Sequence, residues 1–321
     1  MRRRIRALAA ALLALPSALA VAPPAHAADP TTMTSGFYVD PNSSARQWVA
    51  AHPGDGRAAA ISASLANTPM ARWFGSWSGT IGTATGAYVG AADRGDKLPV
   101  LVAYNIYHRD HCGGQSGGGA SSPSAYASWI AQFAGGIAGR PAVVVLEPDS
   151  LADYSCMSEA QVRERQGMIS GALAEFNRQA PHTWVYLDAG NPGWVSAATM
   201  AQHLHEAGLP QAHGFSLNIS NYHTTAQNTA YGNAVNRELA ARYGYTKPFV
   251  VDTSRNGNGS DGEWCNAAGR RIGTPTQLGG GAEMLLWIKA PGESDGDCGV
   301  GTGSTAGQFL PEVAYKMIYG Y

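Results

Sequence analysis

The sequence has few charged residues, few cysteines and, after its first 27 residues, no long hydrophobic run. Charged residues make up 14% of its 321 residues, and four residues are cysteine. A bilayer-spanning helix needs about 20 consecutive apolar residues, and residues 28–321 contain no such run. Of the 22 Lys and Arg, four lie in the first 27 residues, so 18 remain against 23 Asp and Glu. The resulting net charge of about −5 argues against nucleic acid or an anionic membrane surface as a partner.

Common cofactor and metal signatures are also missing. No G-x-G-x-x-G follows the first strand-like segment, so nothing favours dinucleotide binding. His108, His111 and Cys112 lie close together, but no C-x-x-C or H-E-x-x-H spacing supports a metal site. We therefore expect neither a cofactor nor a metal ion.

The first 27 residues have the organisation of a secretory signal peptide. Arginines at positions 2, 3, 4 and 6 precede an Ala- and Leu-rich run, and Ala25-His26-Ala27 matches the A-x-A cleavage signature. We expect residues 1–27 to be removed on export. Residues 28–321 then form a single catalytic domain, a common length for an α/β barrel. The mature protein is expected to be secreted, extracellular and monomeric.

An exported protein meets oxidising conditions, which favour disulfide bonds. Four cysteines allow three connectivities. We favour pairing Cys112 with Cys156 and Cys265 with Cys298, because each pair brackets one strand that ends in a carboxylate and would fix its loops.

Apolar strand-like segments alternate with helical patterns along the chain. The expected strands are residues 71–75, 98–105, 142–149, 183–190, 214–220, 248–254 and 284–290. The expected helices are residues 57–67, 124–137, 158–178, 197–207, 225–243 and 309–319. Strands that read as continuous apolar runs are typical of a parallel sheet covered by helices. We predict an α/β fold, a distorted, partly open TIM-like barrel with about seven parallel strands; a doubly wound open sheet is the alternative.

Four of the strand-like segments run directly into acidic residues: Asp149, Asp188, Asp252 and Asp295. In α/β barrels the catalytic groups lie where the strands end, on one face. Several carboxylates are therefore expected to meet in one cleft.

The segments around these acids form a series of long motifs. They are VAYNIYHRD (102–110), VVVLEPDSL (143–151), YLDAG (186–190), NISNY (218–222), DTSRNGNG (252–259), EWC (263–265) and WIKAPGESDG (287–296). In this order they resemble glycoside hydrolase family 6, the inverting cellulases that cut β-1,4-glucan. The resemblance spans residue 36 to the C-terminus. Three positions depart from the family pattern: Tyr107 replaces a usual proline, His111 is inserted before Cys112, and Asn191 stands where histidine is frequent.

Glycoside hydrolysis needs one carboxyl that stays protonated to donate to the leaving oxygen. Asp149 follows a wholly apolar strand, so desolvation and a neighbouring charge such as Asp110 would raise its pKa. The resemblance makes the same assignment, with Asp149 as proton donor and Asp110 as its partner. It offers two bases: Asp295, or a water chain whose proton ends on Asp110. Asp295 could instead be a loop residue paired with Lys289 or Arg255.

Further roles follow from the resemblance. Tyr104 is expected under the sugar at the cleavage point, and Ser220 is expected to hold the attacking water. Asp188 either orients the other acids or is structural. The implied substrate-binding residues are Trp73, Trp194, Trp264, Asn221, Lys289 and Glu293, with Trp287 as a further candidate inside a strand. Aromatic rings suit the apolar faces of a pyranose.

Loop lengths predict how the substrate is cut. Cellobiohydrolases of this family roof the cleft with long insertions, whereas here the segments after Cys112 and between Glu293 and Gly307 are short. The hypothesis is an inverting endoglucanase that acts on internal bonds of cellulose and related β-glucans, with β-1,4-glucan and cello-oligosaccharides as its partners. The alternatives are a catalytically silent glucan-binding protein on the same fold, a cellobiohydrolase, or a hydrolase of mixed-linkage β-glucan.

Overall fold

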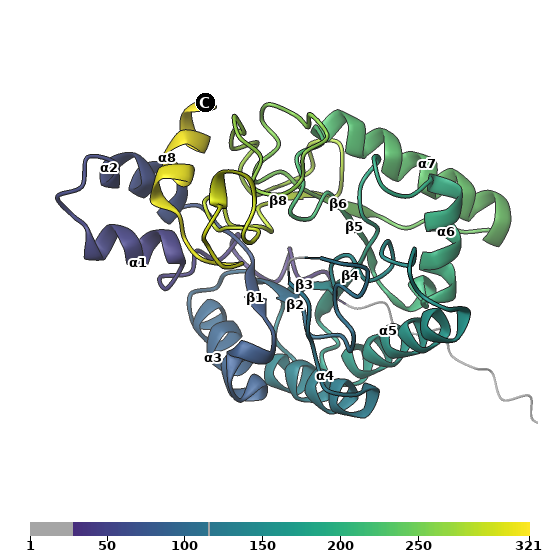
Figure 1. The fold of residues 1–321 in the computed structure, drawn as a ribbon. Helices are drawn as coiled ribbons and strands as arrows, with labels where there is room; N and C mark the ends of the chain where they lie inside the picture. Colours follow the sequence, from purple (N-terminus) through teal and green to yellow (C-terminus); the bar gives the residue numbers. More distant parts are fainter. Residues whose placement is uncertain (1–27, 115) are drawn as a thin grey trace, which may run out of the picture.

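The computed structural model describes residues 28–114 and 116–321, so the predicted signal peptide lies outside the described residues. Helices and strands alternate as expected through the middle of the chain (Figure 1). The helices are α1 (Ser44–Ala51), α2 (Ala58–Ile61), α3 (Ile81–Arg94), α4 (Pro123–Ile137), α5 (Glu159–Gln179), α6 (Ala197–Glu206), α7 (Thr225–Tyr243) and α8 (Pro311–Tyr319). The strands are β1 (Arg72–Phe74), β2 (Val100–Ala103), β3 (Ala142–Leu146), β4 (Thr183–Asp188), β5 (Gly214–Leu217), β6 (Phe249–Asp252), β7 (Gln277–Leu278) and β8 (Met284–Leu286).

The strands form one curled sheet in the order β1-β2-β3-β4-β5-β6-β8-β7. All neighbours pair in parallel except β7, a two-residue antiparallel strand at the β8 edge. The seven parallel strands follow one another in chain order, without the reversal that a doubly wound sheet has, which excludes that alternative. The β1 and β8 edges approach each other, because Ala71 N–H donates to the Trp287 carbonyl at 2.8 Å and Trp73 Nε1 to the Ile288 carbonyl at 2.8 Å. The prediction of a partly open barrel with seven parallel strands is confirmed.

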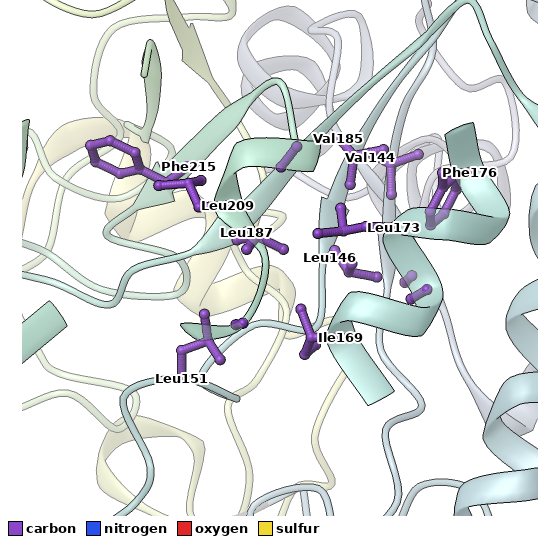
Figure 2. Close-up of a cluster of buried hydrophobic side chains, with 14 of the residues drawn as sticks. Val144, Leu146, Leu151, Ile169, Leu173, Phe176, Val185, Leu187, Leu209 and Phe215 are labelled. Carbon is purple, nitrogen blue, oxygen red and sulfur yellow. The ribbon is translucent and has the colours of Figure 1, made fainter. Parts of the chain in front are cut away.

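Alternate residues along each strand enter two different cores. One set, including Val102, Val145 and Leu286, is buried inside the barrel. The other set faces the surrounding helices, and Figure 2 shows Val144, Leu146 and Val185 against side chains of α5 such as Leu173. Helices α3, α4 and α5 lie next to one another along one side of the sheet, and α6 and α7 continue the layer (Figure 1). Burial on both faces explains why these strands read as continuous apolar runs.

The expected set of elements was incomplete at several points. Helices α1 and α3 and strand β7 were not predicted, and the expected helix over residues 57–67 is the short α2 followed by a π-helical turn, Ser62–Ala66. Helix α3 is rich in Gly, Ala and Thr, which weakens its helical pattern. Its composition has a packing reason: a Cβ on Gly136 of α4 would lie 2.0 Å from Thr85 Oγ1, so the two helices pack at close range.

Two disulfides tie the loops that follow the strands. Cys112 pairs with Cys156 at a Cα–Cα distance of 5.4 Å, and Cys265 pairs with Cys298 at 6.0 Å. Both predicted pairings are confirmed. Across residues 28–114 and 116–321, no helix combines the length and the apolar character that crossing a membrane requires.

Candidate active site

A cleft of about 1110 Å³ opens at the carboxyl ends of the barrel strands. Of the twelve catalytic and substrate-binding residues predicted from the sequence, eleven line it: Trp73, Tyr104, Asp110, Asp149, Trp194, Ser220, Asn221, Trp264, Lys289, Glu293 and Asp295. Asp188 is the exception, because it is buried beneath the cleft. Residues separated by more than 200 positions in the sequence are thus brought together by the parallel strand order.

Asp149 follows β3 in a left-handed backbone conformation, with φ of 70°. Its backbone N–H donates to Asp188 Oδ2 at 2.8 Å, which fixes the turn against the end of β4. In the described part of the chain, no donor lies within hydrogen-bonding distance of the Asp149 carboxyl oxygens. Burial raises the pKa of Asp149 well above its usual range, and the charges of Asp188 and Asp110 raise it further.

Asp188 is surrounded by donors that Asp149 lacks. Besides the Asp149 amide, its carboxylate accepts the Ser216 hydroxyl at 3.3 Å and the Gly190 amide at 3.4 Å. Burial raises the pKa of Asp188, but these hydrogen bonds oppose the rise. The environment therefore favours a proton on Asp149 and a charge on Asp188.

Asp110 and Tyr104 form a second unit at the end of β2. The Tyr104 hydroxyl donates to Asp110 Oδ1 at 3.0 Å, and the Ser116 amide donates to Oδ2 at 2.9 Å. Burial, followed by the charges of Asp149 and Asp110, raises the pKa of Tyr104, which keeps its hydroxyl protonated as a donor. The Tyr104 ring lies edge-on to Trp73 at a centroid distance of 5.1 Å.

Asp295 is held by two cations that follow strands β6 and β8. Arg255 Nη1 lies 3.0 and 2.9 Å from its two oxygens, and Lys289 Nζ lies 3.4 Å from Oδ1. The Asn266 amide also donates to Oδ2 at 3.0 Å. Burial alone would raise the pKa of Asp295, but Arg255 and Lys289 outweigh it and lower the pKa below its ordinary value. The pairing with Lys289 or Arg255 considered from the sequence is present, and both partners take part.

Ser220 lies at the edge of the cleft, in a left-handed conformation with φ of 57°. Its amide donates to Asp252 Oδ2 at 3.2 Å, and its carbonyl accepts a hydrogen bond from Arg255. The neighbouring Asn221 accepts the Tyr222 amide at 2.9 Å. The backbone of this turn is therefore fixed from two sides, while the Ser220 side chain borders the cleft.

The tryptophans differ sharply in exposure. Trp194 and Trp264 line the cleft with 46% and 47% of their surface exposed, and Trp73 lines it half-buried. Trp287 is 1% exposed and donates from Nε1 to the Thr274 carbonyl at 2.9 Å, so its candidacy as a sugar platform was wrong. Its ring instead packs in the cluster between α1, α8 and the barrel.

The remaining polar candidates lie at the rim of the cleft. Glu293 accepts the Ser44 hydroxyl at 2.6 Å, and burial raises the pKa of its carboxyl while Lys289 opposes the rise. Asn191, one of the family departures, uses its side-chain oxygen to accept the Gly193 amide at 2.9 Å. Tyr107, another departure, lies against His108 with the two rings tilted at 53° and a centroid distance of 3.8 Å. Within the described ranges, no group of three or more His, Cys, Asp or Glu side chains is arranged to hold a metal ion.

Four residues at the site received no role, or an incomplete one, in the sequence analysis. Asp252 accepts amides from Ser220, Ser254, Ile288 and Lys289 and so ties β6 to its neighbours. Arg255 was considered only as a partner of Asp295, yet it is 1% exposed and also reaches the Ser220 carbonyl. Glu147, in the same segment as Asp149, is wholly buried, and Trp77 is an exposed cleft residue. Their position at the end of a strand is the sequence signal that could have identified Glu147 and Asp252. Trp77 lies outside the motifs and had no such signal.

The fold and the carboxylate cleft can now be compared with known proteins. The family model for glycosyl hydrolases family 6 matches residues 32–319. Endoglucanase 1 of Streptomyces halstedii is 79% identical over 321 residues, covering 100% of both chains. Endoglucanase A of Thermobispora bispora is 42% identical over 311 residues, covering 95% of this chain and 65% of that protein.

A solved structure agrees in both sequence and fold. Endoglucanase Cel6 from Mycobacterium tuberculosis, in complex with methyl-cellobiosyl-4-deoxy-4-thio-β-D-cellobioside, is 37% identical with a TM-score of 0.82, covering 91% of this chain and 99% of that chain. Together these findings define a glycoside hydrolase. The chain belongs to glycosyl hydrolases family 6, which confirms the resemblance in its motifs.

Proposed function

We propose that the protein is a secreted endoglucanase that hydrolyses internal β-1,4 bonds of cellulose and related β-glucans with inversion at the anomeric carbon. The observation that carries the proposal is that the Asp149 carboxyl lines the cleft, close to other carboxylates and with no hydrogen-bond donor among the described residues, which raises its pKa. A pure binding protein needs no protonated acid, so this feature argues against a silent glucan-binding role. The relatives from Streptomyces halstedii and Thermobispora bispora are endoglucanases, which supports the same activity.

In the proposed mechanism Asp149 donates its proton to the glycosidic oxygen as the bond breaks. Asp188 stays charged and orients the Asp149 backbone through the 2.8 Å hydrogen bond. The nearby negative charges keep the proton on Asp149 until the leaving oxygen becomes basic. Tyr104 lies beside this pair, where its ring can support a distorted sugar.

The proposed base is Asp110, reached through water, in preference to Asp295. Arg255 and Lys289 hold both Asp295 oxygens and lower its pKa, which makes it a weak proton acceptor and a weak nucleophile. Its charge is better suited to stabilising the oxocarbenium-like transition state. A water near Ser220 would then attack directly, and attack by water inverts the anomeric centre.

Several less direct points complete the proposal. Residues 28–321 act as one catalytic domain after removal of residues 1–27, and N-terminal sequencing of the exported protein tests this.

The large exposed apolar side chains outside the cleft are few among the described residues, which supports a monomer. Sedimentation at increasing concentration tests the monomer, and a rising mass would contradict it.

The central test compares wild type with Asp149→Ala. Activity on cellopentaose should fall on the order of 10²–10⁴-fold, because no other group can protonate the leaving oxygen. A cello-oligosaccharide with an activated aryl leaving group should lose far less. Asp93→Ala, which removes an exposed carboxyl of α3 outside the cleft lining, is the control and should keep wild-type activity. Equal losses on both substrates would contradict the general-acid role.

Inversion is checked on the wild-type protein by proton NMR. The α-anomer should appear first at the newly formed reducing end, before mutarotation. Initial release of the β-anomer would show a double displacement and overturn the assignment of water as the nucleophile.

A further inference from the structure

Trp77 is the most exposed tryptophan of the chain, with 57% of its surface accessible, and it lines the catalytic cleft. It lies on a short 3₁₀ turn, Ser76–Ser78, directly after β1. Exposing a large apolar ring to water is unfavourable, and exposed rings commonly mark binding sites. Trp77 belongs to none of the three buried hydrophobic clusters, so packing of the core does not account for a tryptophan at this position.

The Trp77 ring packs against the backbone of its own turn although it is exposed. A Cβ on Gly75 would lie 2.4 Å from the ring, so the indole lies against a backbone that only glycine leaves clear. The Gly75 amide also donates to Ser78 Oγ at 3.1 Å, which closes the turn. A ring held before the ligand arrives loses little conformational freedom on binding.

Arg109 connects Trp77 to the cleavage point. Its guanidinium lies 5.4 Å from the Trp77 ring centroid and 4.3 Å from that of Tyr104. Hydrogen bonds to the Tyr104 carbonyl at 2.7 Å and the Ser116 carbonyl at 2.8 Å fix the guanidinium. Trp77 is therefore joined to Tyr104 through one buried cation, on the β1 side of the cleft.

We propose that Trp77 forms an outer sugar subsite on the β1 side of the cleft, where its indole stacks on a glucosyl unit beyond those bound at Trp73 and Tyr104. The inference rests on the proposed function and adds to it a preference for longer β-1,4-glucan chains. Stacking uses the apolar face of a pyranose and requires no hydrogen bond from Trp77.

The test compares Trp77→Ala with wild type on cellohexaose and cellotriose. For cellohexaose KM should rise roughly tenfold with little change in kcat, as expected for the loss of one stacked sugar. For cellotriose the change in KM should stay under about twofold, because a short substrate need not reach the outer subsite. Trp77→Phe, which keeps an aromatic ring, should recover most of the cellohexaose affinity.

Two controls separate the possible failures. Tyr319→Ala removes an aromatic ring that is also 52% exposed but does not line the cleft, and its KM values should match wild type. Equal KM increases for Trp77→Ala on both substrates, or none on cellohexaose, would overturn the subsite. Wild-type turnover of cellohexaose tests the proposed function separately, since failure of that function would leave no wild-type activity to compare.

Discussion

At the residue scale, the acids of the cleft differ in their partners more than in their position. The Asp149 side chain has carboxylate neighbours and accepts no hydrogen bond from the described residues, whereas Asp295 contacts two cations and a backbone amide. The same side-chain type is therefore driven in opposite directions, towards a proton in one case and towards a charge in the other. This division fits one acid and one electrostatic stabiliser.

The first residue-scale prediction concerns Asp295→Asn. The side chains of Arg255 and Asp295 are 1% and 5% exposed, so the substitution leaves a buried cation without its charged partner. The free energy of unfolding at pH 7 should fall by roughly 3–5 kcal/mol. Because the pKa of Asp295 is lowered in the folded state, its contribution is present above pH 4 and is lost as the pH falls further. Denaturant unfolding at pH 7 and pH 3 measures both effects.

A surface pair provides the control for this prediction. Glu238 and Arg242 of α7 form an i,i+4 ion pair with side chains 37% and 42% exposed. Glu238→Gln should cost less than about 1 kcal/mol, as is usual for solvent-exposed pairs. If the two substitutions lower the free energy of unfolding equally at pH 7, the buried pair of Asp295 and Arg255 contributes no more to stability than an exposed pair.

A carboxylate after an apolar strand marks the end of that strand, and on this basis the sequence predicted that Asp149 and Asp295 lie at the cleft. Asp188 and Asp252 are buried and do not line it. The sequence also predicted the raised pKa of Asp149, but it did not predict the lowered pKa of Asp295. Arg255 could be named only as one possible partner of Asp295, because nothing local shows that its guanidinium is buried against a residue 40 positions away. The roles of Asp295 and Asp188 depend on partners that are distant in the sequence, so the sequence alone could not decide between the two roles considered for each.

At the element scale, Glu147 joins the end of β3 to the loop after β2. Its carboxylate accepts the amides of Asn105 and Ile106, each at 2.9 Å, directly after Tyr104. Burial raises its pKa from 4.5 to about 7, although these hydrogen bonds oppose the rise. The loop that carries Tyr104 and Asp110 is thus anchored by one buried acid.

This anchor predicts a pH-dependent stability. The unfolded carboxyl ionises near pH 4.5 and the folded one near 7, so the contribution of Glu147 is complete below 4.5 and is lost as the pH rises through 7. Glu147→Gln keeps an acceptor oxygen but does not titrate. Relative to wild type, its free energy of unfolding should therefore improve between pH 5 and 8 by up to about 3 kcal/mol. A flat difference, like that expected for the exposed Glu159→Gln, would contradict the raised pKa.

The predictability of the elements follows their burial. Strands β3 and β4 are buried along their whole length and read as unbroken apolar runs. Both residues of strand β7 are exposed. Helix α3 contains glycines and small residues that lower its helical propensity but allow close packing against α4. Neither leaves a periodic apolar pattern, so both were missed.

At the scale of the whole molecule, the two disulfides flank the cleft from different sides. Cys112–Cys156 links the loops after β2 and β3, which carry Asp110 and Asp149. Cys265–Cys298 links the loop after β6 to the loop after β8, which carries Asp295. The loops that complete the site are long and irregular, so covalent links supply order that regular secondary structure does not. This arrangement was predictable because each cysteine pair brackets a carboxylate-bearing strand.

Cleft shape decides whether the enzyme cuts internal bonds or chain ends. Trp194 and Trp264 line the cleft with nearly half of their surface exposed, so the neighbouring loops do not cover them. A chain can then enter from the side without threading an end through a tunnel. Carboxymethylcellulose should lose viscosity rapidly while few reducing ends appear, with Asp149→Ala as the inactive control. Viscosity that stays nearly constant while cellobiose accumulates as almost the sole product would instead show processive attack from chain ends.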